Sequence, residues 1–148
     1  MLVRQPWRSA AEWHRSGTWQ ETTLADLLNA AADARPDDTA YVDGVDGART
    51  TTWSGLRSAA ARLGGDLRAR GCGPGDVVVL VLADGPEMIA AMTAVQAVGA
   101  VAAPLPSSAG VAEVDDVVTR TSAQGVLVDQ PLDLSAAAQV VRLGALES

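Results

Sequence analysis

The run Val77–Leu82 constrains the fold of this chain more than any other sequence feature. It reads VVVLVL, six aliphatic residues with no polar residue between them. A strand that is buried on both faces has this pattern, whereas a strand with one solvent-exposed face alternates polar and apolar residues. Two more apolar runs, Val101–Ala103 and Gly125–Val128, follow it, each after a segment with helical spacing. This strand–helix–strand–helix–strand order predicts parallel pairing with right-handed crossovers.

The sequence therefore predicts an α/β fold, an open and mostly parallel sheet with helices on both faces, as in flavodoxin-like and Rossmann-like subdomains. The first crossover helix is expected to start at Pro86, and the second to span Glu113–Thr121. We expect residues 23–148 to form this single domain. The chain of 148 residues is long enough to bury a core of its own.

Additional elements are expected upstream of the first buried strand. They are a helix capped by Thr23 with Asp26, a strand at Thr39–Asp43, a second strand at Arg49–Trp53, and a helix capped by Ser54. Gly64 and Gly65 lie inside that last helix, where each costs about 1 kcal/mol relative to Ala. We interpret them as positions of close packing against the sheet.

Residues 1–22 are expected to form an N-terminal arm that bears three of the four tryptophans, Trp7, Trp13 and Trp19. Three large rings left in water would make an adhesive patch. The arm therefore either packs on its own domain or covers a partner, and these three residues are candidate interface residues.

Composition excludes several classes of function. The 18 acidic and 11 basic residues give a net charge of −7, which disfavours nucleic acid and membrane surfaces as partners. All of the basic residues are Arg, so Schiff-base and P-loop mechanisms that need a lysine are excluded for this chain alone. A single Cys and a single His exclude an internal disulfide and a Cys/His-only zinc site.

Residue usage and the N-terminal sequence suggest a source and a compartment. Lys and Phe are absent, and Ile and Asn occur once each, which is typical of a GC-rich, actinobacterial genome. The first twenty residues hold no apolar run that resembles a signal sequence. We therefore expect a cytoplasmic protein.

Asp84 and Glu87 are the best candidate ligand-site residues. They follow the buried strand Val77–Leu82 and flank Pro86 at the carboxyl end of the sheet, where open α/β folds bind ligands. Carboxylates at a helix start are also ordinary helix-stabilising groups. Cys72 is interpreted as a small apolar residue in a turn, since His14 is the only imidazole. The residues indicate no catalytic group, cofactor site or metal site.

Three stretches carry a resemblance to a known family: Thr23–Gly44, Thr51–Pro106 and the helix–strand unit that ends in GVLVD at Gly125–Asp129. The second stretch contains two structural signatures, GxGPGDxV at Gly71–Val78 and AVGAxxxPL at Ala97–Leu105. In this order and spacing they resemble the N-terminal region of the adenylate-forming superfamily. That superfamily includes acyl-CoA synthetases, aryl-acid–AMP ligases and nonribosomal-peptide adenylation domains. Residues 13–28, WHRSGTWQETTLADLL, look most like the aryl-acid–AMP ligases and related acid–CoA ligases.

The resemblance implies a fold but transfers no catalytic residue. Family enzymes are several times longer, and their phosphate loop, ribose-binding acidic residue, acyl pocket and C-terminal lysine lie beyond the matching region. Gly55 stands where the family usually has an acidic residue, which touches no chemistry. The isolated chain is therefore not expected to form an acyl-adenylate.

Three hypotheses follow for the function. The first is a non-catalytic component that completes or regulates a split acid-activating enzyme of secondary metabolism, with the missing portion supplied by a protein partner. The second is a free-standing homo-oligomer that binds a small ligand, or performs modest acid–base chemistry, near Asp84 and Glu87. The third is a gene remnant or a fragment of a longer ligase.

Overall fold

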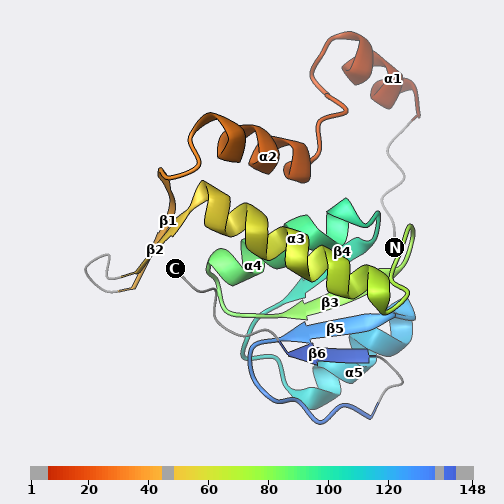
Figure 1. The fold of residues 1–148 in the computed structure, drawn as a ribbon. Helices are drawn as coiled ribbons and strands as arrows, with labels where there is room; N and C mark the ends of the chain where they lie inside the picture. The colour runs from red at the N-terminus through yellow and green to blue at the C-terminus, as the bar shows by residue number, and fades with distance from the viewer. Residues whose placement is uncertain (1–6, 45–48, 136–138, 143–148) are drawn as a thin grey trace.

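The computed structural model describes residues 7–44, 49–135 and 139–142. Figure 1 shows the elements in chain order. They are α1 (Trp7–Arg15), α2 (Leu24–Ala34), β1 (Thr39–Asp43), β2 (Arg49–Thr52), α3 (Trp53–Ala69), β3 (Val77–Val81), α4 (Pro86–Ala97), β4 (Val101–Leu105), α5 (Val111–Thr121), β5 (Gly125–Val128) and β6 (Gln139–Arg142). No helix in these described ranges is long and apolar enough to cross a membrane.

A parallel sheet with the strand order β4-β3-β5-β6 forms the centre of the molecule. The strand β3 pairs with β4 on one side and with β5 on the other, and both pairings are parallel. The antiparallel pair β1 and β2 forms a separate two-stranded sheet. The predicted α/β fold with a parallel sheet is confirmed.

Helices cover both faces of the sheet (Figure 1). On one face, Val78 and Leu80 of β3 pack in a core with residues of α3 and α4. On the other face, Val79 and Val81 pack with residues of α5. These four side chains are 2 % exposed or less. Neither face of β3 is exposed to solvent, and this explains why polar residues do not alternate with the aliphatic ones along the strand.

The strand β4 differs from its prediction as a buried strand. It lies at the edge of the sheet, Val101 is 54 % exposed, and the strand continues through Pro104 to Leu105. The Val101 N–H donates to the carbonyl of Asp76 at 2.8 Å, so alternate N–H groups of β4 face β3. Pro104 falls at an outward position, where its missing N–H costs no hydrogen bond to β3.

The two family signatures meet at one contact between the turns that precede β3 and β4. Gly99, with φ +82°, lies against Pro74, and an added Cβ would come within 3.2 Å of the Pro74 Cα. The Gly75 N–H donates to the Gly99 carbonyl at 3.1 Å. The contact aligns the starts of two adjacent parallel strands, which explains the glycines and proline in both stretches.

The helices upstream of the sheet mostly agree with the predictions. Thr23 and Asp26 form the expected capping box on α2. The cap of α3 is Thr52 rather than Ser54, because the Thr52 hydroxyl accepts the Gly55 N–H at 3.1 Å and the helix starts two residues earlier. The strand β2 accordingly ends at Thr52 instead of Trp53.

The close packing that we expected at the two helical glycines does not involve the sheet. An added Cβ at Gly64 would make ordinary 3.8 Å contacts with Ala94 and Val98, in and just after α4. Gly65 has nothing within 4 Å of that position. The prediction of contact with the sheet is therefore wrong for both residues.

The N-terminal tryptophans form a local cluster. The rings of Trp13 and Trp19 lie 4.7 Å apart, and His14 meets Trp19 edge-on at 5.7 Å. Figure 1 shows α1 beyond α2, on the side away from the sheet. The side chain of Trp7 and residues 45–48, which connect β1 and β2, lie outside what the structure describes. The boundary between an arm at 1–22 and a domain at 23–148 stays a prediction.

We predict that Gly99→Ala and Gly65→Ala change stability in opposite directions. Gly99→Ala places a side chain at positive φ and against Pro74, which should lower the free energy of unfolding by about 1–3 kcal/mol. Gly65→Ala meets open space in a helix and should raise it by about 0.5–1 kcal/mol. Urea titrations measure both values, and equal effects would contradict the proposed contact between the turns.

Candidate functional site

Asp84 lies beside a surface depression at the carboxyl ends of β3 and β4. The residue is exposed and sits in the loop between β3 and α4. The depression has a volume of about 340 Å³ and is lined by Leu82, Asp84, Met88, Pro104, Leu105, Pro106 and Ser107. Apart from Asp84 and Ser107, these side chains are apolar. The site thus combines one carboxylate and one hydroxyl with five apolar side chains.

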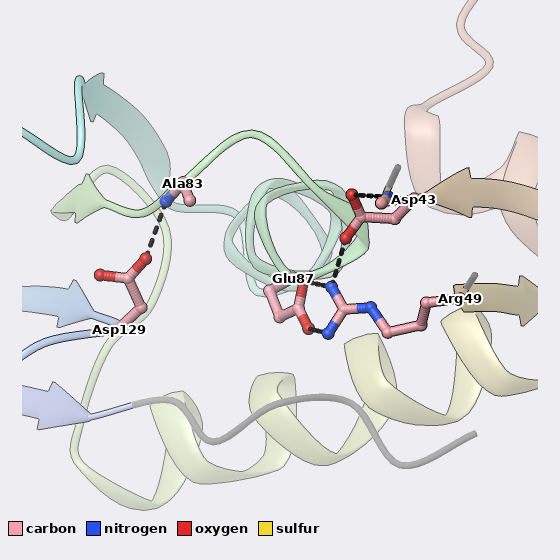
Figure 2. A network of polar contacts seen from close by, with 6 residues as sticks. Asp43, Arg49, Ala83, Glu87 and Asp129 are labelled. Carbon is pink, nitrogen blue, oxygen red and sulfur yellow. Dashed lines mark hydrogen bonds and ion pairs between the residues drawn. The ribbon is translucent and has the colours of Figure 1, made fainter. Parts of the chain in front are cut away.

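The crevice between β3 and β5 is bridged by a hydrogen bond. This is the switch point of the sheet, because α4 leads from β3 toward β4 while the chain after β5 leads toward β6. The carboxylate of Asp129, which follows β5, accepts the Ala83 N–H at 2.9 Å (Figure 2). Asp129 was not singled out from the sequence. It positions the loop that carries Asp84.

Glu87 faces the β1–β2 hairpin and does not line the depression. Its carboxylate lies 3.4 Å from the Arg49 guanidinium, which also contacts Asp43 at 2.6 Å (Figure 2). The side chain of Glu87 is only 16 % exposed. The structure therefore separates the two candidate residues: Asp84 borders the depression, whereas Glu87 ties the start of α4 to the hairpin.

Arg49 is held between two carboxylates. Its pKa is raised above the ordinary value, chiefly by the hydrogen bond to Asp43 and then by the charge of Glu87. Asp43 and Arg49 are register partners in the hairpin, so opposite charges at paired positions were a signal available in the sequence. The approach of Glu87 depends on tertiary packing and had no local signal.

The glycine-rich turn Gly71–Asp76 uses its own backbone donors. The carboxylate of Asp76 accepts the Gly73 N–H at 2.8 Å, and the Gly75 N–H is used in the contact with Gly99. Both donors are engaged within the protein, and the turn precedes a strand rather than a helix. Its interpretation as a plain helix-to-strand turn is confirmed.

Metal ligands are not gathered in the described part of the chain. Within residues 7–44, 49–135 and 139–142, no group of three or more His, Cys, Asp or Glu side chains could hold a metal ion.

We predict that Arg49→Gln loosens the hairpin. The substitution leaves Asp43 and Glu87 close together without the cation between them, so β1 and β2 should exchange their amide hydrogens faster. The effect should shrink in 1 M NaCl, where the Debye length is about 3 Å. Arg120→Gln, which breaks an exposed pair with Asp116 on α5, is the matched control and should leave hairpin exchange unchanged.

We predict that Cys72 is unreactive in the folded protein. Burial, followed by the charge of Asp76, raises the pKa of its thiol, and each unit of increase lowers the thiolate fraction about tenfold. Alkylation at pH 8 should therefore be slower in buffer than in urea, where the thiol is exposed.

The same shift sets a pH dependence for stability. The unfolded chain releases the thiol proton first, so the free energy of unfolding should fall as the pH rises above about 8.5. Cys72→Ala should remove this part of the decline. A native alkylation rate equal to that in urea would contradict the burial of the thiol.

Solved structures similar to this chain are adenylate-forming proteins. Klebsiella oxytoca NpsA in complex with 3-hydroxyanthranilyl-AMSN matches at 22 % identity and a TM-score of 0.70, over 83 % of this chain and 25 % of that one. The nonribosomal peptide synthetase FmoA3 matches at 29 % identity and a TM-score of 0.74, over 93 % and 15 %. The N-terminal domain of FACL13 from Mycobacterium tuberculosis matches at 20 % identity and a TM-score of 0.69, over 82 % and 34 %.

The chain covers only part of these proteins, and curated sequences give no further relative. The chain spans about a quarter of the length of NpsA, and a comparison of the sequence with curated proteins gives no significant match. The family model for AMP-binding enzymes nevertheless matches residues 28–147, most of the chain. The resemblance inferred from the sequence is thereby confirmed: this chain belongs to the AMP-binding enzyme family and corresponds to an N-terminal part of its adenylate-forming proteins.

Proposed function

We propose that this chain is the non-catalytic N-terminal portion of an acid-activating assembly, which it completes or regulates. The observation that carries the proposal is the combination of family membership with the absence of any lysine in the sequence. The phosphate loop, acyl pocket and catalytic lysine that the family uses would come from polypeptide outside these 148 residues. The reaction of the assembly would join a carboxylic acid to AMP and release pyrophosphate.

The negative net charge of this chain supports the proposal that another polypeptide binds the ATP phosphates. The chain has a net charge of −7, so its field repels a nucleoside triphosphate. Adenylation needs cationic groups on the developing pyrophosphate. The completing polypeptide would supply those cations, and this chain would supply the packed sheet against which they are positioned.

Exposed apolar side chains support a role in an assembly. Val101 on the edge strand β4 is 54 % exposed, Leu27 on α2 is 58 % exposed, and Trp19 is 40 % exposed. Apolar groups left in water at these places would be covered by a partner at a gain in free energy. Trp7, Trp13 and Trp19 remain proposed interface residues.

The compound bound to NpsA supports a proposal for the substrate class. NpsA was solved with 3-hydroxyanthranilyl-AMSN, an aryl compound, and this chain is similar to it. We therefore propose an aryl or related carboxylic acid as the substrate of the assembly, with a place in secondary metabolism. An ATP-consuming reaction supports a cytoplasmic setting, and the absence of Lys and Phe supports an actinobacterial source.

A free-standing homo-oligomer that binds a small ligand is the alternative. The depression beside Asp84 favours it, since it joins a carboxylate to an apolar wall. Acid–base chemistry by an Asp84–Glu87 pair has less support, because Glu87 contacts Arg49 instead.

We predict that the isolated chain shows no ATP–pyrophosphate exchange with any acid, because it holds no lysine and no phosphate loop. Tagged protein should recover from its native lysate one lysine-containing polypeptide of the same family in comparable amount. Exchange should then appear in the mixture and disappear when either component is omitted. Mass spectrometry and a radiolabelled pyrophosphate assay measure the two outcomes.

Two results would contradict the proposal. Recovery of nothing but copies of this chain would favour the homo-oligomer, and exchange by the isolated chain would show a catalytic site within it. Restoration of activity only in one continuous polypeptide would instead identify the chain as a fragment of a longer ligase.

A further inference from the structure

We propose that the depression beside Asp84 binds a lysine or arginine side chain of the polypeptide that completes the assembly. The identity of that polypeptide rests on the proposed function, whereas the binding of a basic side chain is tested without it.

The walls of the depression suit an aliphatic stem. Met88 comes from the first turn of α4, and Leu105 and Pro106 come from the end of β4 and the residue after it. A volume of about 340 Å³ lies at the lower end of the range for small-ligand sites, about 300–1,000 Å³. A single long side chain fits such a space, because lysine and arginine lay their methylene stems along apolar surface.

The charge of the depression suits a cation. Asp84 makes no hydrogen bond or ion pair with any residue that the structure describes, and it is exposed at the rim. Three arginines of the described ranges form ion pairs with other carboxylates: Arg49 with Asp43 and Glu87, Arg57 with Asp33, and Arg120 with Asp116. A cation for Asp84 is therefore expected from another polypeptide or another part of the same one.

The loop that carries Asp84 is held in place before any partner binds. The hydrogen bond from the Ala83 N–H to Asp129 fixes the residue just before Asp84 (Figure 2). Pro86 and the following turn of α4 fix the residues after it. The carboxylate is thus presented from a positioned backbone, which lowers the entropic cost of binding.

The net charge of this chain favours a basic side chain from the completing polypeptide. This chain has no lysine and a net charge of −7, so a partner that docks on it gains from basic residues at the contact. Three quarters of the NpsA chain has no counterpart here, which is ample polypeptide to supply one. The depression is therefore assigned to a basic side chain of the completing polypeptide.

Model side chains test the site on the intact chain. Protein labelled with ¹³C at the methionine methyls is titrated with Nα-acetyl-lysine methylamide, and the Met88 signal is assigned by Met88→Leu. The uncharged probe Nα-acetyl-norleucine methylamide has the same stem without the ammonium. The lysine probe should shift Met88 but not Met92, and should bind about two- to fivefold more tightly than the norleucine probe, the range of an exposed ion pair.

Two substitutions test whether the Asp84 carboxylate is the group that attracts the ammonium of the lysine probe. Asp84→Asn should remove the preference for lysine, whereas Asp66→Asn, an equal change of charge on α3, should keep it. Equal binding of the two probes to the unchanged protein, or a preference that survives Asp84→Asn, would overturn the proposal. So would the absence of any shift at Met88.

A second readout separates this inference from the proposed function. If a completing polypeptide is recovered, Asp84→Arg should weaken its binding and Asp66→Arg should not. Binding that is unaffected by Asp84→Arg would overturn this use of the depression while leaving the split assembly intact. Failure to recover any polypeptide would affect the proposed function alone, since the probe titration would still stand.

Discussion

Parallel pairing of β3 on both of its edges is the interaction on which the rest of the structure depends. A strand with neighbours on both sides has its backbone groups satisfied, and its side chains can then be apolar on both faces. Val78 and Leu80 form one core with α3 and α4, and Val79 and Val81 form the other with α5. The strand β5 does the same, with Leu127 in the first core and Val126 and Val128 in the second, so two adjacent strands join the two layers of helices.

The ends of β3 are fixed by different means. At its start, the turn that contains Pro74 packs against Gly99, which aligns β3 with β4. At its end, the Ala83 N–H is held by Asp129, which follows β5. The loop with Asp84 is thus anchored to the end of β5 through Asp129, and the candidate site lies at the carboxyl end of the same strands that build the core.

Sequence patterns predicted the central part of the fold well because the signals there are local. The run Val77–Leu82, the proline at the start of α4 and the capping box at Thr23 each depend on neighbouring residues, and each is confirmed. The edge position of β4 could not be predicted in this way. A short apolar run has the same sequence pattern in an edge strand as in a central strand of a sheet. Only the strand order shows that β4 is an edge strand and that Val101 is exposed. The separation of Glu87 from Asp84 likewise depends on where the hairpin packs, which no local pattern encodes.

Hydrogen–deuterium exchange of this chain, alone and with its completing polypeptide, tests the central claim most directly. The account predicts that β3 and β5 are protected in the isolated chain, since they lie inside its own core. It also predicts that residues 101–107 and the loop at 83–85 gain protection only in the presence of the second polypeptide. Unprotected β3 and β5 in the isolated chain would contradict the independent core. Unchanged exchange at 83–85 and 101–107 in a complex would contradict the assignment of this edge of the sheet as the place where the assembly is completed.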